Sequence, residues 1–217
     1  MQINILIKLY KRKMHDTDYK TKPRPSKLFM YEKFYKDIGH IQENNKNFTI
    51  TEFACGASKI LKDIKPSYYQ GIDLKDELIK ESKKKFVGEN YEFFIGNMID
   101  FNTNNKTDLG ICIQTLGINL SFDNQILLNC LNNLNDHVLK NGCIIFNLSM
   151  DIYIKNKDNI DNFCKNNYQE NEFVYYGLFN NRYEYKLTRI LVFLEKILFF
   201  RSRFKKFVYI KCKLKKN

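Results

Sequence analysis

Between residues 48 and 150, short apolar runs alternate with stretches in which apolar residues recur every three or four positions. The apolar runs predict strands at 48–54, 68–74, 91–96, 108–116 and 143–150. The stretches between them predict helices at 57–64, 75–86 and 123–140, the last one ending at an Asn141–Gly142 cap. Strands that are apolar throughout are typical of a parallel sheet with both faces covered by helices. The pattern therefore predicts an α/β fold.

The two ends of the chain extend this pattern less regularly. Residues 26–38 predict a helix that ends at Gly39, after a basic and turn-prone head. Two further strands are predicted at 172–179 and 206–214, and residues 186–200 favour a helix over a strand. We therefore expect a basic head and helix at 1–45, a cap for substrate or cofactor, followed by one domain at 46–217. Its sheet should have seven strands, mostly parallel, with helices on both faces.

Charge and cysteine content restrict the partners and the compartment. The formal net charge of +12 favours an anionic ligand, nucleic acid or an acidic membrane surface. A coding composition rich in Lys, Asn and Ile is the first explanation of this charge, because the excess concentrates near the two ends. The six cysteines form no CxxC pair, which indicates a reducing cytosol instead of a disulfide scaffold or structural zinc. No run approaches the roughly 18 apolar residues of a membrane span. We expect a cytoplasmic protein, at most peripheral to a membrane.

Small and polar residues stand where the first three predicted strands end. The first strand runs into Cys55, Gly56 and Ser58, and Gly56 lets the backbone pass close to a ligand. Asp73 closes the second strand, where a carboxylate is placed to hold a ribose diol. Asn97 follows the third strand and can accept a hydrogen bond from an exocyclic amine. Because ligands of doubly wound sheets bind at the carboxyl ends of the strands, these residues predict one binding site.

Over about residues 30–150 the sequence resembles the class I S-adenosylmethionine-dependent methyltransferases, which have a Rossmann-like fold. Their first motif, an acidic residue followed by alternating glycines, reads EFACGAS at 52–58, with Ala54 and Ser58 in place of two glycines. Asp73 in GIDL matches their second motif, and Asn97 in GNMIDF stands where the third usually has Asp. TDLGICIQTLGIN and NGCIIFNLSM match the regions of their fourth and fifth strands.

The resemblance implies S-adenosyl-L-methionine as cofactor and assigns the residues that hold it. Residues 55–58 would hold the methionine part, Asp73 the ribose, Asn97 and Met98 the adenine, and Gln114 with Thr115 the sulfonium edge. An N-terminal aromatic residue often closes over the cofactor in this family. The implied cofactor-binding set is Tyr31, Tyr35, Glu52, Ala54, Cys55, Gly56, Ser58, Asp73, Leu74, Asn97, Met98, Gln114 and Thr115.

Each of these positions also has a plain structural interpretation. The ACGAS stretch can be an ordinary turn, Asp73 an N-cap of the next helix, and Asn97 a turn residue. The candidates for a catalytic base are Asp151, directly after the fifth strand, and His15 in the head. Asp151 can equally be a helix cap or surface acid, and His15 a solvated residue. The acids near the predicted site are not grouped with histidines at ligand spacing, so no metal site is predicted.

The residues after the fourth predicted strand limit which acceptor molecules are expected. QTLG stands where amino-directed DNA and RNA methyltransferases carry a D/N-P-P-Y/F tetrapeptide, and no proline precedes a cysteine as cytosine-C5 enzymes require. One short domain favours a small-molecule acceptor, and the chain looks most like bacterial sugar-modifying methyltransferases. We expect transfer to a hydroxyl of a sugar or nucleotide-sugar in capsule or O-antigen biosynthesis.

Three alternatives to that function remain open. An rRNA or tRNA methyltransferase would explain the basic ends with their interleaved aromatic residues. A protein that binds the cofactor without catalysis would explain the altered glycines. A basic amphipathic surface at 186–207 would dock on anionic lipid, although an apolar stripe usually faces a core. The sequence does not define the oligomeric state.

Overall fold

The computed structural model describes residues 24–116, 124–179, 181, 185–197 and 205–214. The contacts divide the chain into two compact units. The larger unit comprises residues 44–174 and 208–217, and the smaller comprises residues 1–43 and 175–207. The predicted division at 45/46 stays a prediction, because the smaller unit also takes in residues from the second half of the chain.

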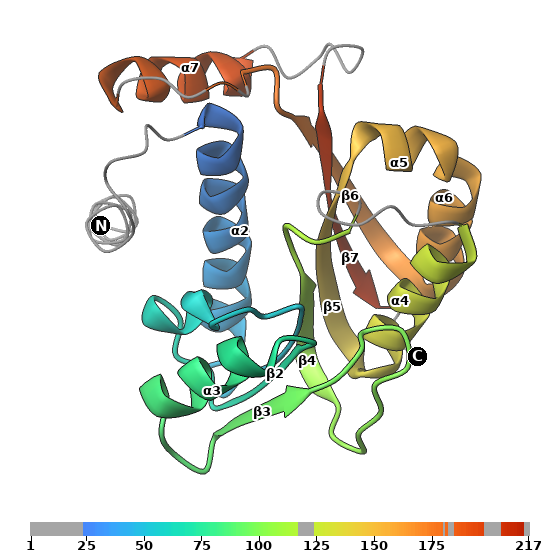
Figure 1. Cartoon of the computed structure of the whole chain (residues 1–217). Helices are drawn as coiled ribbons and strands as arrows, with labels where there is room; N and C mark the ends of the chain where they lie inside the picture. The colour runs from blue at the N-terminus through green and yellow to red at the C-terminus, as the bar shows by residue number, and fades with distance from the viewer. Residues whose placement is uncertain (1–23, 117–123, 180, 182–184, 198–204, 215–217) are drawn as a thin grey trace. The chain divides into compact units, whose positions relative to one another are not determined.

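Within the described residues, seven strands form one sheet in the order β3-β2-β1-β4-β5-β7-β6 (Figure 1). The strands are β1 (Thr49–Phe53), β2 (Tyr68–Asp73), β3 (Tyr91–Ile95), β4 (Thr107–Cys112), β5 (Val138–Ser149), β6 (Tyr168–Tyr176) and β7 (Phe207–Leu214). The pairs from β3 across to β5 are all parallel. The strand order reverses between β1 and β4, which is where such sheets bind ligands. The predicted Rossmann-like α/β fold with a mostly parallel seven-stranded sheet is confirmed.

Buried side-chain hydrogen bonds fix the register of the central strands. The Gln70 amide donates to the Thr51 hydroxyl over 2.6 Å, and the hydroxyls of Thr51 and Thr107 lie 2.8 Å apart. The Asp108 carboxylate accepts the backbone N–H of Thr49 at 2.8 Å. A slip in register would leave these groups unpaired, at about 1–3 kcal/mol for each buried one. The register therefore holds the carboxyl ends of β1, β2 and β4 in fixed positions.

Helices cover both faces of the sheet, as predicted. In Figure 1, α3 (Asp76–Lys85) lies on one side, and α4 (Asn124–Asp136), α5 (Met150–Lys155) and α6 (Lys157–Asn167) lie on the other. The buried residues of α4 recur at helical spacing and are Leu127, Cys130, Leu131 and Leu134. In α3, two acids in the first turn and three lysines in the last turn both complement the helix dipole. None of the helices in the described ranges has the length and apolar character that crossing a membrane requires.

The described part of the smaller unit contains α2 (Pro25–Asn44) and α7 (Tyr185–Ile197), and a buried carboxylate organises it. Glu195 accepts from the Lys205 ammonium at 2.8 Å and from the Gly177 backbone N–H at 2.8 Å. Just beyond Gly177, the Phe179 carbonyl accepts the N–H of Ser26 at 3.2 Å, at the start of α2. Because Glu195 and Lys205 are removed from water, each depends on the other as a partner.

Two glycines that were predicted to end helices do not do so. α2 continues past Gly39 to Asn44, because one interior glycine costs only about 1 kcal/mol relative to alanine. α4 ends at Asp136, and Gly142 lies inside β5. A Cβ at Gly142 would lie 2.3 Å from a methyl carbon of Val138 and 2.7 Å from the Asp108 carbonyl oxygen. Gly142 is therefore required by close packing where β5 bulges against β4.

Other boundaries also differ from the prediction. The helix predicted at 57–64 is only a single 3₁₀ turn, η1 (Lys59–Lys62), between the left-handed Ser58 and Pro66. α5 and α6 were not predicted, and β6 begins at Tyr168 instead of at 172. The helix predicted at 186–200 is confirmed up to Ile197, and its last three positions lie outside the described residues.

Candidate functional site

The loop after β1 carries three left-handed residues in alternation. Ala54, Gly56 and Ser58 have φ angles of 54°, 55° and 48°. This conformation is free of strain for glycine but costs about 1–2 kcal/mol for other L-residues. The left-handed backbone at positions 54, 56 and 58 therefore explains why small residues alternate after the acid Glu52. Ala54 and Ser58 adopt this backbone although they are not glycines.

Gly56 lies where the loop faces open space. A Cβ built there would meet nothing closer than a methyl carbon of Leu78, at 4.0 Å. The Gly56 N–H donates to Asp73 Oδ2 at 2.8 Å, which ties the β1 loop to the end of β2. A ligand can therefore approach the backbone at Gly56 without a side chain in the way.

Asp73 closes β2 and turns back towards this loop. Its Oδ2 accepts the Gly56 N–H, and its Oδ1 accepts the Lys75 N–H at 2.9 Å. The N-cap residue of α3 is Lys75, so Asp73 does not cap that helix. An ionised carboxylate offers about four acceptor sites. Two of them remain for hydroxyl donors from a ligand at this edge.

A buried hydroxyl network lies beneath the loop. The Tyr69 hydroxyl lies 2.5 Å from Glu52 Oε2 and 3.1 Å from Ser58 Oγ. The Ser82 hydroxyl of α3 lies 3.2 Å from Ser58 Oγ. Burial, followed by the Glu52 charge, raises the pKa of Tyr69 well above its usual range, so the phenol keeps its proton. The network thus joins β1, β2, α3 and the loop.

Cys55 contributes its backbone and a small buried side chain. Its N–H donates to the Ile72 carbonyl at 3.0 Å. Burial, followed by the nearby Glu52 charge, raises the pKa of the Cys55 thiol, so it stays protonated at neutral pH and is a poor nucleophile. Its sulfur would lie 3.0 Å from a Cβ at Gly71, which explains the glycine in GID.

The predicted adenine-binding residues follow β3. Asn97 Oδ1 accepts the Ile99 N–H at 3.1 Å, a contact typical of a turn residue, and the oxygen keeps a second lone pair. Met98 is buried, and its carbonyl accepts the Asn133 side-chain amide at 3.1 Å. Leu74, beside Asp73, is 63% exposed. An apolar side chain and a polar turn thus flank Asp73 at this edge.

The end of β4 is shaped by a residue of β5. Gln114 has a φ of 64°, and its N–H donates to the side-chain oxygen of fully buried Asn147 at 2.6 Å. The Thr115 hydroxyl lies 3.4 Å from the Ile113 carbonyl oxygen. Gln114 and Thr115 therefore stand at the carboxyl end of β4, next along the edge from the β1 loop.

The remaining predicted residues do not join this cluster in the described structure. Asp151 is exposed in the first turn of α5, where an acid complements the helix dipole. Tyr31 and Tyr35 belong to α2 of the smaller unit and stack on each other with ring centroids 6.2 Å apart. Their roles stay predictions. His15 lies outside the described residues.

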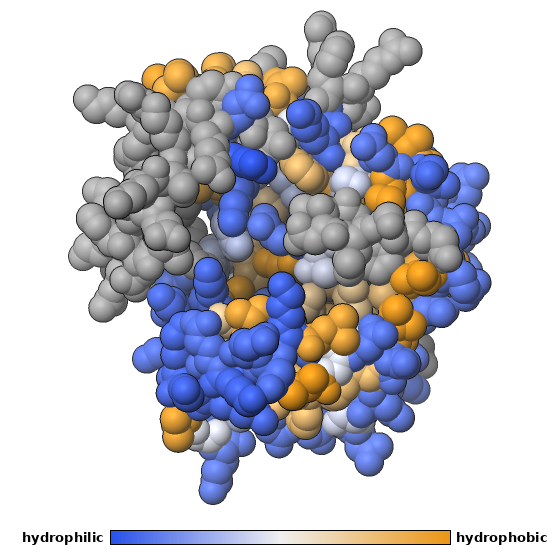
Figure 2. All heavy atoms as spheres, in the orientation of Figure 1, coloured by the Kyte–Doolittle hydropathy of each residue, from blue (hydrophilic) through white to orange (hydrophobic). Residues whose placement is uncertain are grey.

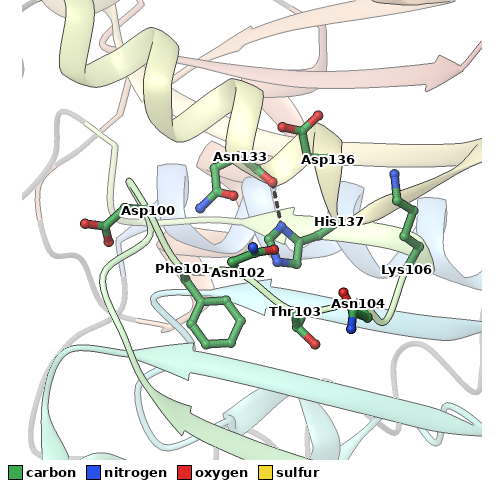
Figure 3. Close-up of a pocket in the computed structure, with 9 residues that line it drawn as sticks. All are labelled: Asp100, Phe101, Asn102, Thr103, Asn104, Lys106, Asn133, Asp136 and His137. Carbon is green, nitrogen blue, oxygen red and sulfur yellow. Dashed lines mark hydrogen bonds between the residues drawn. The ribbon is translucent and has the colours of Figure 1, made fainter.

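A separate hollow of about 490 Å³ lies between the β3–β4 connection and the end of α4 (Figure 3). No predicted site residue lines it. His137 lies beside Asn102, and its Nδ1 donates to the Asn133 carbonyl at 2.8 Å, since a carbonyl oxygen can only accept. The ring of Phe101 stacks on that of His137 with centroids 5.7 Å apart. Residues 96–106, several of which line the hollow, form no helix.

Sequence reasoning missed Tyr69, Ser82 and Asn147. Each is buried and carries a polar group, and the partner of that group lies far away in the sequence. For Tyr69 the sequence does contain a signal, because Tyr69 and Gly71 share one face of β2. A large side chain next to a glycine on the same face indicates close packing. Nothing comparable marks Ser82 or Asn147.

The comparisons with known proteins concern the structure, since no protein-family model and no curated protein matches this sequence. N-methyltransferase NodS from Bradyrhizobium japonicum WM9, in complex with S-adenosyl-l-homocysteine, superposes with a TM-score of 0.61 at 13% identity, covering 98% of this chain and 100% of that chain. An S-adenosylmethionine-dependent methyltransferase from Clostridium acetobutylicum ATCC 824 gives a TM-score of 0.54 at 17% identity, covering 100% of both chains.

Other similarities are partial. The chain spans 55% of SAM-bound CalS10, an amino pentose methyltransferase from Micromonospora echinaspora, with a TM-score of 0.44 at 14% identity over 54% of this chain. At such identities the similarity concerns the fold. The strand order, the parallel register and the two full-length superpositions agree, and the chain has the Rossmann-like fold of the class I S-adenosylmethionine-dependent methyltransferases.

Proposed function

We propose that the chain is an S-adenosylmethionine-dependent methyltransferase that methylates a hydroxyl of a sugar or nucleotide-sugar in bacterial surface-glycan biosynthesis, such as that of capsule or O-antigen. The observation that carries the cofactor assignment is Asp73. Its carboxylate is fixed by two backbone N–H groups at the carboxyl end of β2 and keeps acceptor sites for a diol.

The residues at this edge fit the proposed cofactor. Asp73 would hold the ribose hydroxyls, and the open backbone at Gly56 would accommodate the methionine part. Asn97 and Met98 would contact the adenine, and Gln114 with Thr115 would face the sulfur. When bound, the cofactor supplies a methyl group already activated by a positively charged sulfur.

The chain's own contribution to the reaction is mainly alignment. Transfer to a hydroxyl is an in-line displacement, which gains most from a fixed orientation of the acceptor. The acceptor also loses a proton, and Asp151 and His15 are the candidate bases. None of the six cysteines forms a disulfide and all are buried, which supports placing the reaction in the cytoplasm.

The acceptor class is the less constrained part of the proposal. The net charge of +12 complements a nucleotide diphosphate or an acidic glycan. The absence of a D/N-P-P-Y/F tetrapeptide after β4 argues against an exocyclic nucleobase amine. NodS is an N-methyltransferase, so amino groups of sugars belong in the same test as hydroxyls.

The test has two stages. Calorimetry with S-adenosylhomocysteine should show one site, and transfer of a labelled methyl group should follow with nucleotide-sugars, amino sugars, rRNA and tRNA as acceptors. Labelling of a sugar supports the proposal. Binding without transfer to any acceptor favours the non-catalytic alternative, labelling of RNA reverses the choice of substrate, and the absence of binding refutes the cofactor assignment.

A second candidate activity, contact with an anionic membrane surface, is favoured by α7. Figure 2 shows apolar side chains at the surface over this helix. The exposed apolar residues of α7 are 44–62% exposed and are Leu187, Ile190, Phe193 and Ile197. A basic protein with such a helix face can bind anionic lipid through both apolar burial and charge. The protein should co-sediment with phosphatidylglycerol vesicles, and the bound fraction should fall in Phe193→Ser. Equal co-sedimentation with phosphatidylcholine vesicles would refute binding to anionic lipid.

A further inference from the structure

The buried network under the β1 loop joins three hydroxyl groups to one acid. The Tyr69 phenol donates to the Glu52 carboxyl group over 2.5 Å. Having used its proton, the phenol oxygen must accept from the Ser58 hydroxyl, 3.1 Å away. Ser58 Oγ in turn accepts from the Ser82 hydroxyl at 3.2 Å. These contacts therefore connect α3 through the loop to the acid of β1.

The network meets the loop where its backbone is strained. Ser58 has φ 48° and ψ 45° and carries a Cβ that disfavours this conformation. The Ser82 hydroxyl also lies 3.4 Å from the Gly56 carbonyl oxygen, so one α3 side chain contacts two of the left-handed residues. Both ends of the network are buried, where such hydrogen bonds do not compete with water.

We propose that Ser82 is a positioning residue for the cofactor loop: acting through Ser58 and Tyr69, it holds position 58 in the left-handed conformation that glycine would adopt unaided. This inference rests on the proposed function, because the loop is assigned to the methionine part of the cofactor. It adds a specific role for an α3 side chain that acts through residues of the loop. It also explains why a serine is tolerated at position 58.

Two substitutions at position 58 separate the hydroxyl from the backbone. Ser58→Ala and Ser58→Gly both remove the hydroxyl, but only alanine keeps the strained Cβ. We expect Ser58→Ala to weaken S-adenosylhomocysteine binding about tenfold, and Ser58→Gly to change it less than about twofold. Equal losses in the two variants would overturn the proposal.

Ser82→Ala tests whether Ser82 acts through Ser58. It should weaken binding about fivefold when Ser58 is present and have no effect when combined with Ser58→Gly. In turnover, KM for the methyl donor should rise while kcat changes little. A loss of the same size in both backgrounds would show that Ser82 acts only on overall stability.

Ser67→Ala is the matched control, because the Ser67 hydroxyl also bonds a backbone carbonyl, that of Asn47 at 2.6 Å, before β2 begins. It should leave binding unchanged. Amide hydrogen exchange at Gly56 and Ser58, measured without ligand, should accelerate in Ser82→Ala and not in Ser67→Ala. If the wild-type chain binds no cofactor, the proposed function fails, and the exchange data still decide the role of the network; unchanged exchange in Ser82→Ala would refute it.

Discussion

The carboxyl ends of β1–β3 and those of β4–β5 form two parts of one sheet edge, and they are built differently. At the first part, two hydrogen bonds tie the β1 loop to the end of β2: the Cys55 N–H donates to the Ile72 carbonyl, and the Gly56 N–H donates to the Asp73 carboxylate. At the second part, the side chain of Asn147 holds the Gln114 backbone.

Under the proposed function, this difference separates two tasks. A loop that is tied to the next strand end at two successive residues offers a fixed backbone, which suits a donor that is the same for every acceptor, as the proposed methyl donor is. A strand end that is held by one side-chain contact can change from one acceptor to another. The comparison therefore assigns donor affinity to the first part and turnover to the second, and each assignment can be tested alone.

The largest effect is expected at Asp73. Asp73→Ala removes the acceptor for two backbone N–H groups and for the proposed ribose hydroxyls, so binding of S-adenosylhomocysteine should fall about 100-fold or more by calorimetry. Asp100→Ala, an exposed acid after β3, should leave affinity unchanged. Normal affinity in Asp73→Ala would contradict the assignment of donor binding to this part of the edge.

The next effect is expected at Asn147. Asn147→Ala leaves the Gln114 N–H without its acceptor. Gln114 is assigned to the sulfur edge of the donor, beside the methyl group that is transferred, whereas donor affinity is assigned mainly to Asp73. We therefore expect kcat to fall about tenfold while donor affinity changes less than about twofold. Single-turnover rates and calorimetry on the same preparation measure both. If affinity falls as much as kcat does, the two parts of the edge do not act separately.

Alkaline pH should weaken the donor side through Cys55. Burial raises the pKa of this thiol above its ordinary value of 9.0, so above that pH the unfolded chain binds fewer protons than the folded one. The free energy of unfolding therefore falls as pH rises, by about 1 kcal/mol at pH 10 from this group. The wild type should lose more stability between pH 8 and pH 10 than Cys55→Ala does, as measured by denaturant unfolding. Identical pH profiles would show that the thiol becomes exposed to solvent before the chain unfolds.

The smallest effect is expected at Asp151. This exposed acid lies in the first turn of α5, so Asp151→Asn should lower the free energy of unfolding by about 0.5 kcal/mol and leave kcat nearly unchanged. A fall in kcat of about 100-fold, with stability unaltered, would instead identify Asp151 as the general base.

The parts of the fold that were predictable depend on local patterns. The strands around Asp73 and the helix at α7 follow from apolar runs and helical spacing that lie within one element. The contacts that shape the site join distant positions, such as Ser82 to Ser58 and Tyr69 to Glu52, which no local pattern shows. Gly142 was assigned to a helix cap because the close packing around it, which includes the Asp108 carbonyl of another strand, leaves no local pattern.

The place of β7 in the sheet has a consequence for synthesis on the ribosome. This strand inserts between β5 and β6, and its residues Val208, Tyr209 and Ile210 are buried. A nascent chain can form the parallel strands β1 to β5 early, but β6 has no neighbour in the sheet until β7 has left the exit tunnel. The sheet is therefore completed only after β7 has emerged. A messenger RNA truncated before the β7 codons would release a chain in which β6 has no neighbouring strand.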